Sequence, residues 1–245
     1  MNVSLVAGSA ISYENLAAND ATQRHPLGSL GIGPDGSWYR YAQAGASDLV
    51  AGNIVQRAAP VANHLANTPP AVAIGATSFS YTPGATAGAA NLYAEGYLQV
   101  DTTPGNGYRY RISGHPAIVS STAFNLVLYP DDGIRVALTT SSRVGLHHNL
   151  YKNVIQCPTT VTGPVCGGVV TPITATQFGW LQTRGPFPAL INGTPGVGIG
   201  LVISATTAGA LDVAAVAAEI NVRIIAHAMQ VCVSTKNNMV NLMLD

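Results

Sequence analysis

The sequence predicts a mainly β protein, an antiparallel β-sandwich or barrel with long loops and at most one short helix. Segments in which outward and inward residues alternate recur along the chain, and turn-forming residues separate them. The 245 residues include 26 glycines and 15 prolines, a combined share above the usual ~12%. This composition favours many turns over long helices, and 47% apolar residues are enough to build a substantial core.

The clearest predicted strands alternate with a period of two or are rich in the aromatic and β-branched residues that strands favour. Tyr108-Arg109-Tyr110-Arg111-Ile112 is the strictest example. We expect strands at 38–41, 108–112, 124–129 and 134–138. Turns are expected between strands wherever Gly, Pro, Asp and Asn cluster, at 33–36, 103–107, 130–133 and 162–164.

The C-terminal third contains less regular patterns. Strands are predicted within 196–203 and 221–233, followed by a turn at 236–238 and a last strand over 239–244. The alanine-rich stretch 210–220 is the one candidate for a helix, with Asp212 near its start.

Two domains are predicted, with a boundary near residue 66. Residues 1–65 would form an N-terminal arm and β-hairpin region, and residues 66–245 the sandwich or barrel core; a single domain is the alternative. Charge-poor stretches at 1–21 and 84–90 are expected to be flexible arms that order on a neighbouring protein, or else ordinary surface loops.

The charge of the chain is unusually low. Eleven Lys and Arg balance eleven Asp and Glu, and charged residues make up 9% of the sequence where about 25% is usual. With no net positive field, we expect no nucleic-acid partner and no anionic-membrane partner. No basic signal segment and no long apolar run is present, so we expect synthesis in a cytoplasm.

No catalytic, cofactor-binding or metal-binding residues are predicted, and we expect a protein that is not an enzyme. The three glutamates are scattered, and Asp131-Asp132 are turn formers in a Pro-Asp-Asp-Gly sequence. Adjacent His147-His148 would point to opposite faces of a strand, which disfavours a shared metal ion. No dinucleotide or phosphate-binding glycine loop occurs.

The cysteines leave one question open. Cys157 and Cys166 flank a stretch that would bring them opposite one another if it folded as a hairpin, so a disulfide between them is conceivable, whereas cytoplasmic synthesis disfavours it. Cys232 lies in an apolar run and is expected to be a small buried side chain.

Aromatic residues alternate with arginines in two predicted strands. Tyrosines interleave with Arg40, Arg109 and Arg111. This pattern predicts cross-strand packing of guanidinium groups on rings, and the alternative, nucleobase stacking, conflicts with the zero net charge. Trp180 is expected in the core, with an interface anchor as the alternative.

Several segments, taken in order, resemble accessory structural proteins of tailed bacteriophage heads, of the decoration or cement type. They are Leu27-Gly28-Ser29-Leu30-Gly31, the stretch from Pro34 to Gly45 that contains Trp38-Tyr39-Arg40-Tyr41, and 49–55, 107–115 and 178–185. The resemblance implies a virion structural protein on the outside of an icosahedral capsid, where a dimer or trimer would bind the major capsid protein lattice and clamp neighbouring capsomers. A charge-poor surface suits that role, because its burial desolvates few ions.

The alternative function is a receptor-binding or adhesive β-rich protein of a tail or cell surface, which would bind saccharides through exposed aromatic residues. An enzyme is the third possibility and a major shell subunit the fourth. Neither is favoured, because no nucleophile and base are paired and long helices are lacking.

Overall fold

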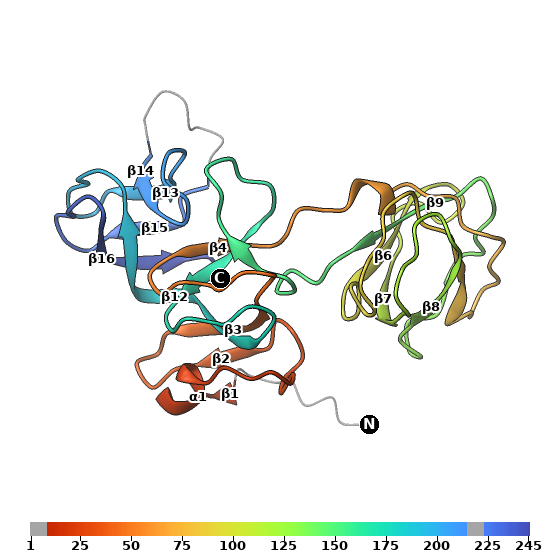
Figure 1. Ribbon diagram of the computed structural model, residues 1–245, viewed down its shortest axis with the longest axis horizontal. Helices are drawn as coiled ribbons and strands as arrows, with labels where there is room; N and C mark the ends of the chain where they lie inside the picture. The colour runs from red at the N-terminus through yellow and green to blue at the C-terminus, as the bar shows by residue number, and fades with distance from the viewer. Residues whose placement is uncertain (1–8, 215–222) are drawn as a thin grey trace. The chain divides into compact units, whose positions relative to one another are not determined.

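The computed structural model describes residues 9–214 and 223–245, and it confirms a mainly β protein (Figure 1). Within the described residues, the single α-helix has five residues. The chain divides into two compact units. Unit 1 combines Met1–Ala59 with Leu150–Asp245, and unit 2 is the intervening segment Pro60–Asn149.

This division differs from the expected boundary between 1–65 and 66–245. The strands of the N-terminal segment find their partners beyond residue 150 rather than among themselves: Trp38–Gln43 pairs with Phe178–Ile191, and Ile54–Gln56 lies between Ile155–Gln156 and Val165–Val169. Unit 2 is therefore an insertion within unit 1. Sequence patterns are local, so they do not reveal which strands pair across an insertion.

Unit 1 is built on an eleven-stranded sheet with one helix. Its elements are β1 Ser9–Ala10, α1 Tyr13–Ala17, β2 Leu30–Ile32, β3 Trp38–Gln43, β4 Ile54–Gln56, β10 Ile155–Gln156, β11 Val165–Val169, β12 Phe178–Ile191, β13 Gly200–Ile203, β14 Leu211–Val213, β15 Ala226–Ala228 and β16 Lys236–Met243. The path of neighbouring strands runs β1-β2-β3-β12-β14-β13-β15-β16, and β12 also pairs directly with β16.

Strand β12 connects the two halves of unit 1. Its first half pairs with β3 and its second half with β16, and the register of the β3 ladder shifts between Gln182 and Arg184. Gly185 follows this shift with a φ of +99°, and a Cβ at this position would stand 2.6 Å from the Ser37 hydroxyl. Only glycine fits such a conformation at such a close approach.

Two prolines lie inside the second half of β12, where strand interiors normally exclude proline. Along a strand, successive backbone N–H groups point to alternate sides. The N–H of Leu190 points away from β16 and bonds to the carbonyl of Gly52, and Pro186 and Pro188 precede Leu190 by four and two residues, so they occupy equivalent positions. The missing N–H groups therefore belong to the edge that faces away from β16. The ladder with β16 is left intact.

Unit 1 contains three clusters of buried side chains. Phe187 and Ile191 of β12 pack with Leu201, Val240 and Leu242 in the largest cluster, which lies under β13, β15 and β16. A second surrounds Val55 and Leu181. In the third, Trp180 is 7% exposed and packs edge-on against Tyr41, so the prediction of a core position for Trp180 is confirmed.

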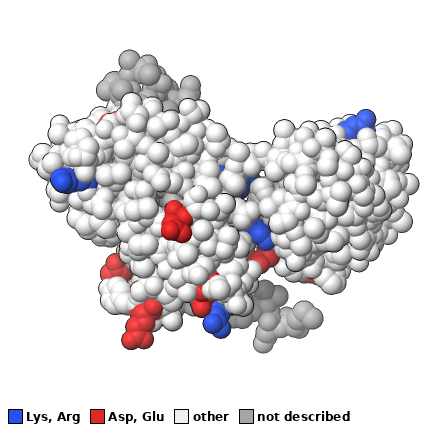
Figure 2. Space-filling model, in the orientation of Figure 1, with Lys and Arg blue, Asp and Glu red and all other residues white. Residues whose placement is uncertain are grey.

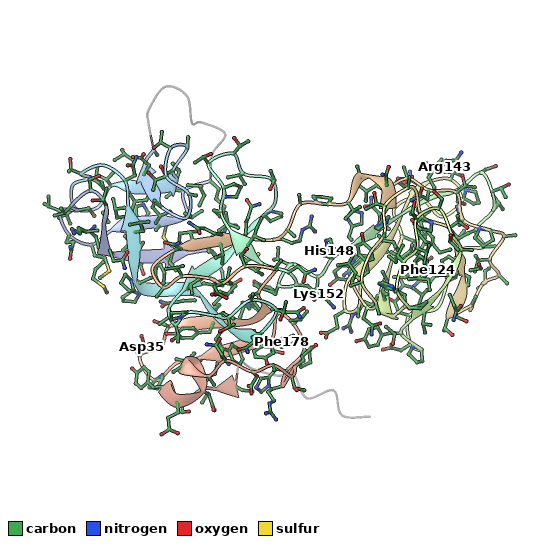
Figure 3. All side chains as sticks on the ribbon, in the orientation of Figure 1. Asp35, Phe124, Arg143, His148, Lys152 and Phe178 are labelled. Atoms are coloured by element: carbon green, nitrogen blue, oxygen red, sulfur yellow. The ribbon has the colours of Figure 1, made fainter. Side chains whose placement is uncertain are left out.

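Unit 2 is one five-stranded antiparallel sheet with long connections packed on one face. Its elements are the 3₁₀ turn η1 Ala62–His64, β5 Ser78–Tyr81, β6 Tyr97–Thr102, β7 Arg109–Gly114, β8 Phe124–Leu128 and β9 Arg143–His147, in the order β5-β8-β7-β6-β9. Alternate residues of each strand point inward, and Figure 3 shows Phe124 among them. Inward-facing residues include Tyr81, Leu98, Tyr110, Ile112, Leu126 and Leu146.

Tyr93 lies at the centre of a buried group of histidines in unit 2. Its hydroxyl is hydrogen-bonded to Nδ1 of His64 at 2.6 Å, while Nε2 of that ring donates to the Thr86 carbonyl. His148 stacks on the Tyr93 ring with a centroid distance of 4.7 Å. Burial raises the pKa of Tyr93, so this phenol stays protonated.

His115 is held in one protonation state by its two partners. Its Nε2 accepts the N–H of Tyr93 at 3.0 Å, and its Nδ1 lies 2.7 Å from the carbonyl of Pro116. A carbonyl only accepts and a backbone N–H only donates, so the ring is neutral with its proton on Nδ1. A second proton would place two N–H groups against one another.

The predicted strands at 38–41, 108–112 and 124–129 are confirmed as β3, β7 and β8. In contrast, 134–138 is not a strand, although Ile134 and Leu138 are buried in the expected alternation. The segment bonds to a neighbouring segment at its two ends, where Ile134 bonds to Gly75 and Ala76 and Leu138 bonds to Val72, and these bonds do not form a continuous ladder.

Three further expectations in unit 1 need correction. The turn expected at 236–238 is the start of β16, and the chain reverses one residue earlier at Thr235, which has a positive φ of 62°. The helix expected over 210–220 begins instead as strand β14, and its remainder includes residues outside the described part. Strand β15 covers only Ala226–Ala228 of the longer strand expected over 221–233.

The expected flexible arms pack on the protein where they are described. In the arm 1–21, residues 9–21 carry β1, α1 and a bridge from Asp20 to Phe178; residues 1–8 lie outside the described residues. In the arm 84–90, Gly84 donates to the Asn63 carbonyl at 2.7 Å and Gly88 bridges Ile118. Both arms are therefore surface segments that bond to their own unit.

Candidate functional site

Unit 1 exposes an apolar sheet face on three neighbouring strands. Register places Pro188 of β12 opposite Met239 of β16, and Met229, directly after β15, donates its N–H to the Met239 carbonyl at 3.0 Å. Pro186 lies two residues before Pro188 on the same side of β12. We call these four residues, Pro186, Pro188, Met229 and Met239, the apolar face; all four are exposed.

The face carries no formal charge over its central rows. The neighbouring row consists of Pro186, Asn241 and His227, in register across the same three strands. The opposite sides of these strands are buried, with Phe187, Ala228 and Val240 in the core. One side of this antiparallel sheet thus fills the core, and the other presents methionine and proline to solvent where polar residues are the usual choice.

The loop after β15 holds two more apolar side chains outward. Val231 and Val233 are 67% and 58% exposed, whereas Cys232 between them is buried and donates its N–H to the Pro195 carbonyl. The side chain of Asn238 is buried and bonds to both the N–H and the carbonyl of Val233 at 2.9 Å. These bonds fix the loop, so the two valines are presented in a defined position.

An apolar hollow lies farther along the same sheet. It has a volume of about 520 Å³, and its described lining includes Val161, Val165, Val202, Ile225 and Leu244, with Arg223 as its one charged member. The guanidinium of Arg223 donates to the carbonyls of Met243 and Leu244. Ile225 belongs to the same buried cluster as Phe187 and Val240, and Val165 and Leu244 pack against that cluster, so the hollow lies beside this core rather than on the apolar face.

The scarcity of charge extends over the visible surface of the molecule (Figure 2). The ion pairs of the described residues include Asp20–Arg24, Arg40–Asp245 and Asp132–Arg135, the first and last of which link residues four and three apart in sequence. Exposed large apolar side chains concentrate toward the C-terminal part of unit 1. They include Val197, Ile199, Ile224, Met229, Val231, Val233 and Met239.

The cysteines are free thiols, and Cys157 and Cys166 do not form the conceivable disulfide. The stretch between them is not a hairpin, because β4 lies between β10 and β11. Two strand spacings separate the cysteines by roughly 10 Å, more than the ~7 Å limit for bridged Cα atoms. Burial raises the pKa of the Cys157 thiol to about 12 and also raises that of Cys166. Cys232 is buried in the core as predicted.

The histidine and aspartate pairs are separated by the structure. His147 is half-buried on β9, whereas His148 is buried against Tyr93, so the two rings diverge as expected. Asp132 accepts the backbone N–H of Arg111 at 2.6 Å and pairs with Arg135, while Asp131 is exposed. Within residues 9–214 and 223–245, no group of three or more His, Cys, Asp and Glu side chains is placed to hold a metal ion.

Arg109 and Arg111 form the predicted cross-strand packing on tyrosine rings, whereas Arg40 pairs with Asp245 and donates to the Gly28 carbonyl. The guanidinium of Arg109 lies 4.6 Å from the centre of the Tyr97 ring, and that of Arg111 lies 4.3 Å from the Tyr129 ring. In unit 1, Arg184 stacks on Trp38.

The sequence analysis missed the apolar face. Its signal is the alternation in β16, where Met239 and Asn241 occupy one side and Val240 and Leu242 the other. A methionine in such a strand indicates a buried position by default. Only the three-dimensional structure shows that nothing in the described chain covers it.

Comparison of the chain with models of known families, with curated proteins and with solved structures finds no match in any of the three. Among the described residues, no helix is long and apolar enough to cross a membrane.

Proposed function

We propose that the protein is a virion structural protein, a decoration or cement protein that binds the outer surface of an icosahedral phage head and stabilises it. The observation that carries this proposal is the apolar face of unit 1, an open, uncharged sheet surface with apolar side chains held in place beside it. Contiguous exposed apolar surface marks a site of protein association. The resemblance in sequence to accessory phage-head proteins supplies the partner, the major capsid protein lattice.

The free energy expected from burying the apolar face suits binding through many contacts, each of them weak. Burying one valine or methionine side chain fully contributes about 1.5–3 kcal/mol, and association costs at least about 4 kcal/mol. A few side chains per copy therefore give modest affinity. A dimer or trimer that spans several capsomers would multiply it through effective concentration. A ligand that binds only the assembled lattice stabilises that lattice.

The test uses shells of the encoding phage assembled without this protein. We expect the purified protein to co-sediment with these shells and to raise their melting temperature. The double variant M229E/M239E places two carboxylates on the apolar face and should lose co-sedimentation, because burying unpaired charge is unfavourable. Both side chains are exposed, so the variant should fold, and tryptophan fluorescence checks this.

The matched control is Val119→Glu, which adds the same charge at a 60% exposed apolar position of unit 2. This variant should bind shells as the unaltered protein does. The proposal fails if the unaltered protein does not bind the shells, or if M229E/M239E binds as well as V119E.

A further inference from the structure

The outward side of the unit 2 sheet carries a cluster of arginines and tyrosines that the proposed function does not use. Arg111 of β7 is in register with Tyr97 of β6 on one side and bonds through its carbonyl to the N–H of Tyr129 on the other. Arg109 lies two residues away on the same side of β7, and Arg135 lies close to both Arg109 and Arg111. We call Tyr97, Arg109, Arg111, Tyr129 and Arg135 the arginine face.

Arg109 and Arg111 are fixed in orientation but have no acidic partner. Each guanidinium stacks on a tyrosine ring, which holds its plane and leaves its N–H groups at the edge. Neither arginine forms an ion pair with any carboxylate of the described chain. Both are exposed. Planar guanidinium groups in this state match an oxyanion that accepts two parallel hydrogen bonds.

The two nearby aspartates have different roles. Both carboxylate oxygens of Asp132 are bonded within the protein, because one pairs with Arg135 and the other accepts the N–H of Arg111. It is thus a positioning residue that ties β7 to the 130–135 turn. Asp131 is exposed and also lines the surface hollow, of about 340 Å³, that the arginines border.

The balance of charge selects among possible anions. Three arginines and two aspartates line the hollow, which gives it a local charge of one positive unit. A single carboxylate neutralises that charge. A phosphate dianion or a polyanion such as nucleic acid would face two aspartates without enough cations to compensate.

We propose that the arginine face binds a carboxylated saccharide, with the carboxylate of a uronic-acid-type sugar on Arg109 and Arg111. The free carboxylate of Asp131 accepts hydrogen bonds from sugar hydroxyls, and exposed Gln99, in register with Arg109, offers both a donor and an acceptor. This combination of fixed guanidinium groups, a carboxylate and an amide is suited to a ligand that bears one negative charge and several hydroxyls.

The test is calorimetric titration of the full-length protein with oligogalacturonate at low ionic strength, where ionic contacts are least screened. Fully methyl-esterified oligogalacturonate has the same sugars without the charge, and inorganic phosphate is an oxyanion without the hydroxyls. The site variant is Arg111→Gln. The matched control is Arg143→Gln, which removes the same charge from β9 of the same unit, where the guanidinium bonds to the Thr140 and Ser142 carbonyls.

We expect oligogalacturonate to bind, the methyl ester and phosphate to bind at least about tenfold more weakly, and R111Q to lower the affinity for oligogalacturonate by about tenfold, the usual effect of losing a charged hydrogen-bonding partner. R143Q should bind as the unaltered protein does. No binding of oligogalacturonate overturns the inference. So does equal binding of the ester or of phosphate, and so does equal weakening by R111Q and R143Q.

This inference stands apart from the proposed role on phage shells. M229E/M239E, which alters only unit 1, should keep oligogalacturonate binding, and R111Q should keep shell binding. Failure of one assay therefore does not decide the other.

Discussion

The two units have the same balance of charge but distribute it differently. Each contains as many basic as acidic residues. In unit 2, three of the four arginines border one hollow on the outer side of the sheet, whereas the open sheet face of unit 1 carries methionine and proline. Composition alone therefore did not indicate the difference. The placement of a few residues gives one surface suited to protein association and another suited to a small anion.

The units also differ in how their cores are made. Unit 1 has both tryptophans and all three cysteines, and its β12 joins strands from both ends of the chain. Unit 2 has neither residue type, and its core includes buried tyrosines and histidines. Tryptophan fluorescence and thiol labelling thus report unit 1 alone, which makes the comparison measurable.

The largest expected effect comes from replacing a buried core side chain by alanine in one unit at a time. Phe187→Ala should destabilise unit 1 by about 3–5 kcal/mol, because the ring is fully buried and a Cβ on Gly168 would already touch it. Leu126→Ala should destabilise unit 2 by about 2–5 kcal/mol. Guanidinium unfolding, followed by tryptophan fluorescence and by labelling of the thiols, measures the first change.

In this comparison, Leu126→Ala serves as the control for Phe187→Ala. It should shift the near-ultraviolet signal of the tyrosines, most of which lie in unit 2, and leave the tryptophan transition in place. Equal shifts of the tryptophan transition by both variants would show that the units unfold as one body.

A smaller effect is expected from acid, and it should begin at a different pH in each unit. His115 is neutral in the folded state because of its partners Tyr93 and Pro116, while an unfolded histidine binds a proton below about pH 6.5. Below that pH the unfolded state holds more protons than the folded state. The free energy of unfolding of unit 2 should therefore fall by about 1.4 kcal/mol for each pH unit below that value.

Unit 1 should respond to acid through a carboxylate, at lower pH. Burial opposes ionisation of Asp245, but hydrogen bonds from Arg40 and Thr183 outweigh it and hold the pKa of Asp245 below its usual value. The stabilisation is complete above the unfolded pKa of about 3.9 and is lost as pH falls through the folded value. Melting curves from pH 8 to pH 3 should show unit 2 weakening first; earlier weakening of unit 1 would contradict this assignment.

Sequence patterns predicted the features that neighbouring residues determine, namely strands, turns and the stacking of side chains on one strand face. Alternation gave strands β3, β7 and β8, and the Gly33–Gly36 and 103–107 turns form as expected, with Gly36 at a φ of +80° and Gly105 at +90°. The stacking of Arg109 and Arg111 on tyrosines followed from their spacing, because alternate residues share one face of a strand.

Long-range pairing was not predictable in the same way. Nothing in 157–166 signals that β4 will lie between the two flanking strands, and nothing near residue 66 signals that the chain returns to unit 1 at residue 150. Likewise, Met239 alternates as a core or a surface residue would. Which side of β16 is covered depends on partners far away in sequence.

The most direct measurement of the central claim, the proposed binding to phage shells, is hydrogen exchange of the protein with and without such shells. We expect binding to slow exchange in peptides covering β15, β16 and the intervening loop, 226–243, which form and flank the apolar face. Peptides covering 97–111, which include Tyr97, Arg109 and Arg111 of the arginine face, should exchange at the same rate in both samples. Slowed exchange confined to unit 2, or no change anywhere in the presence of shells, would contradict the account.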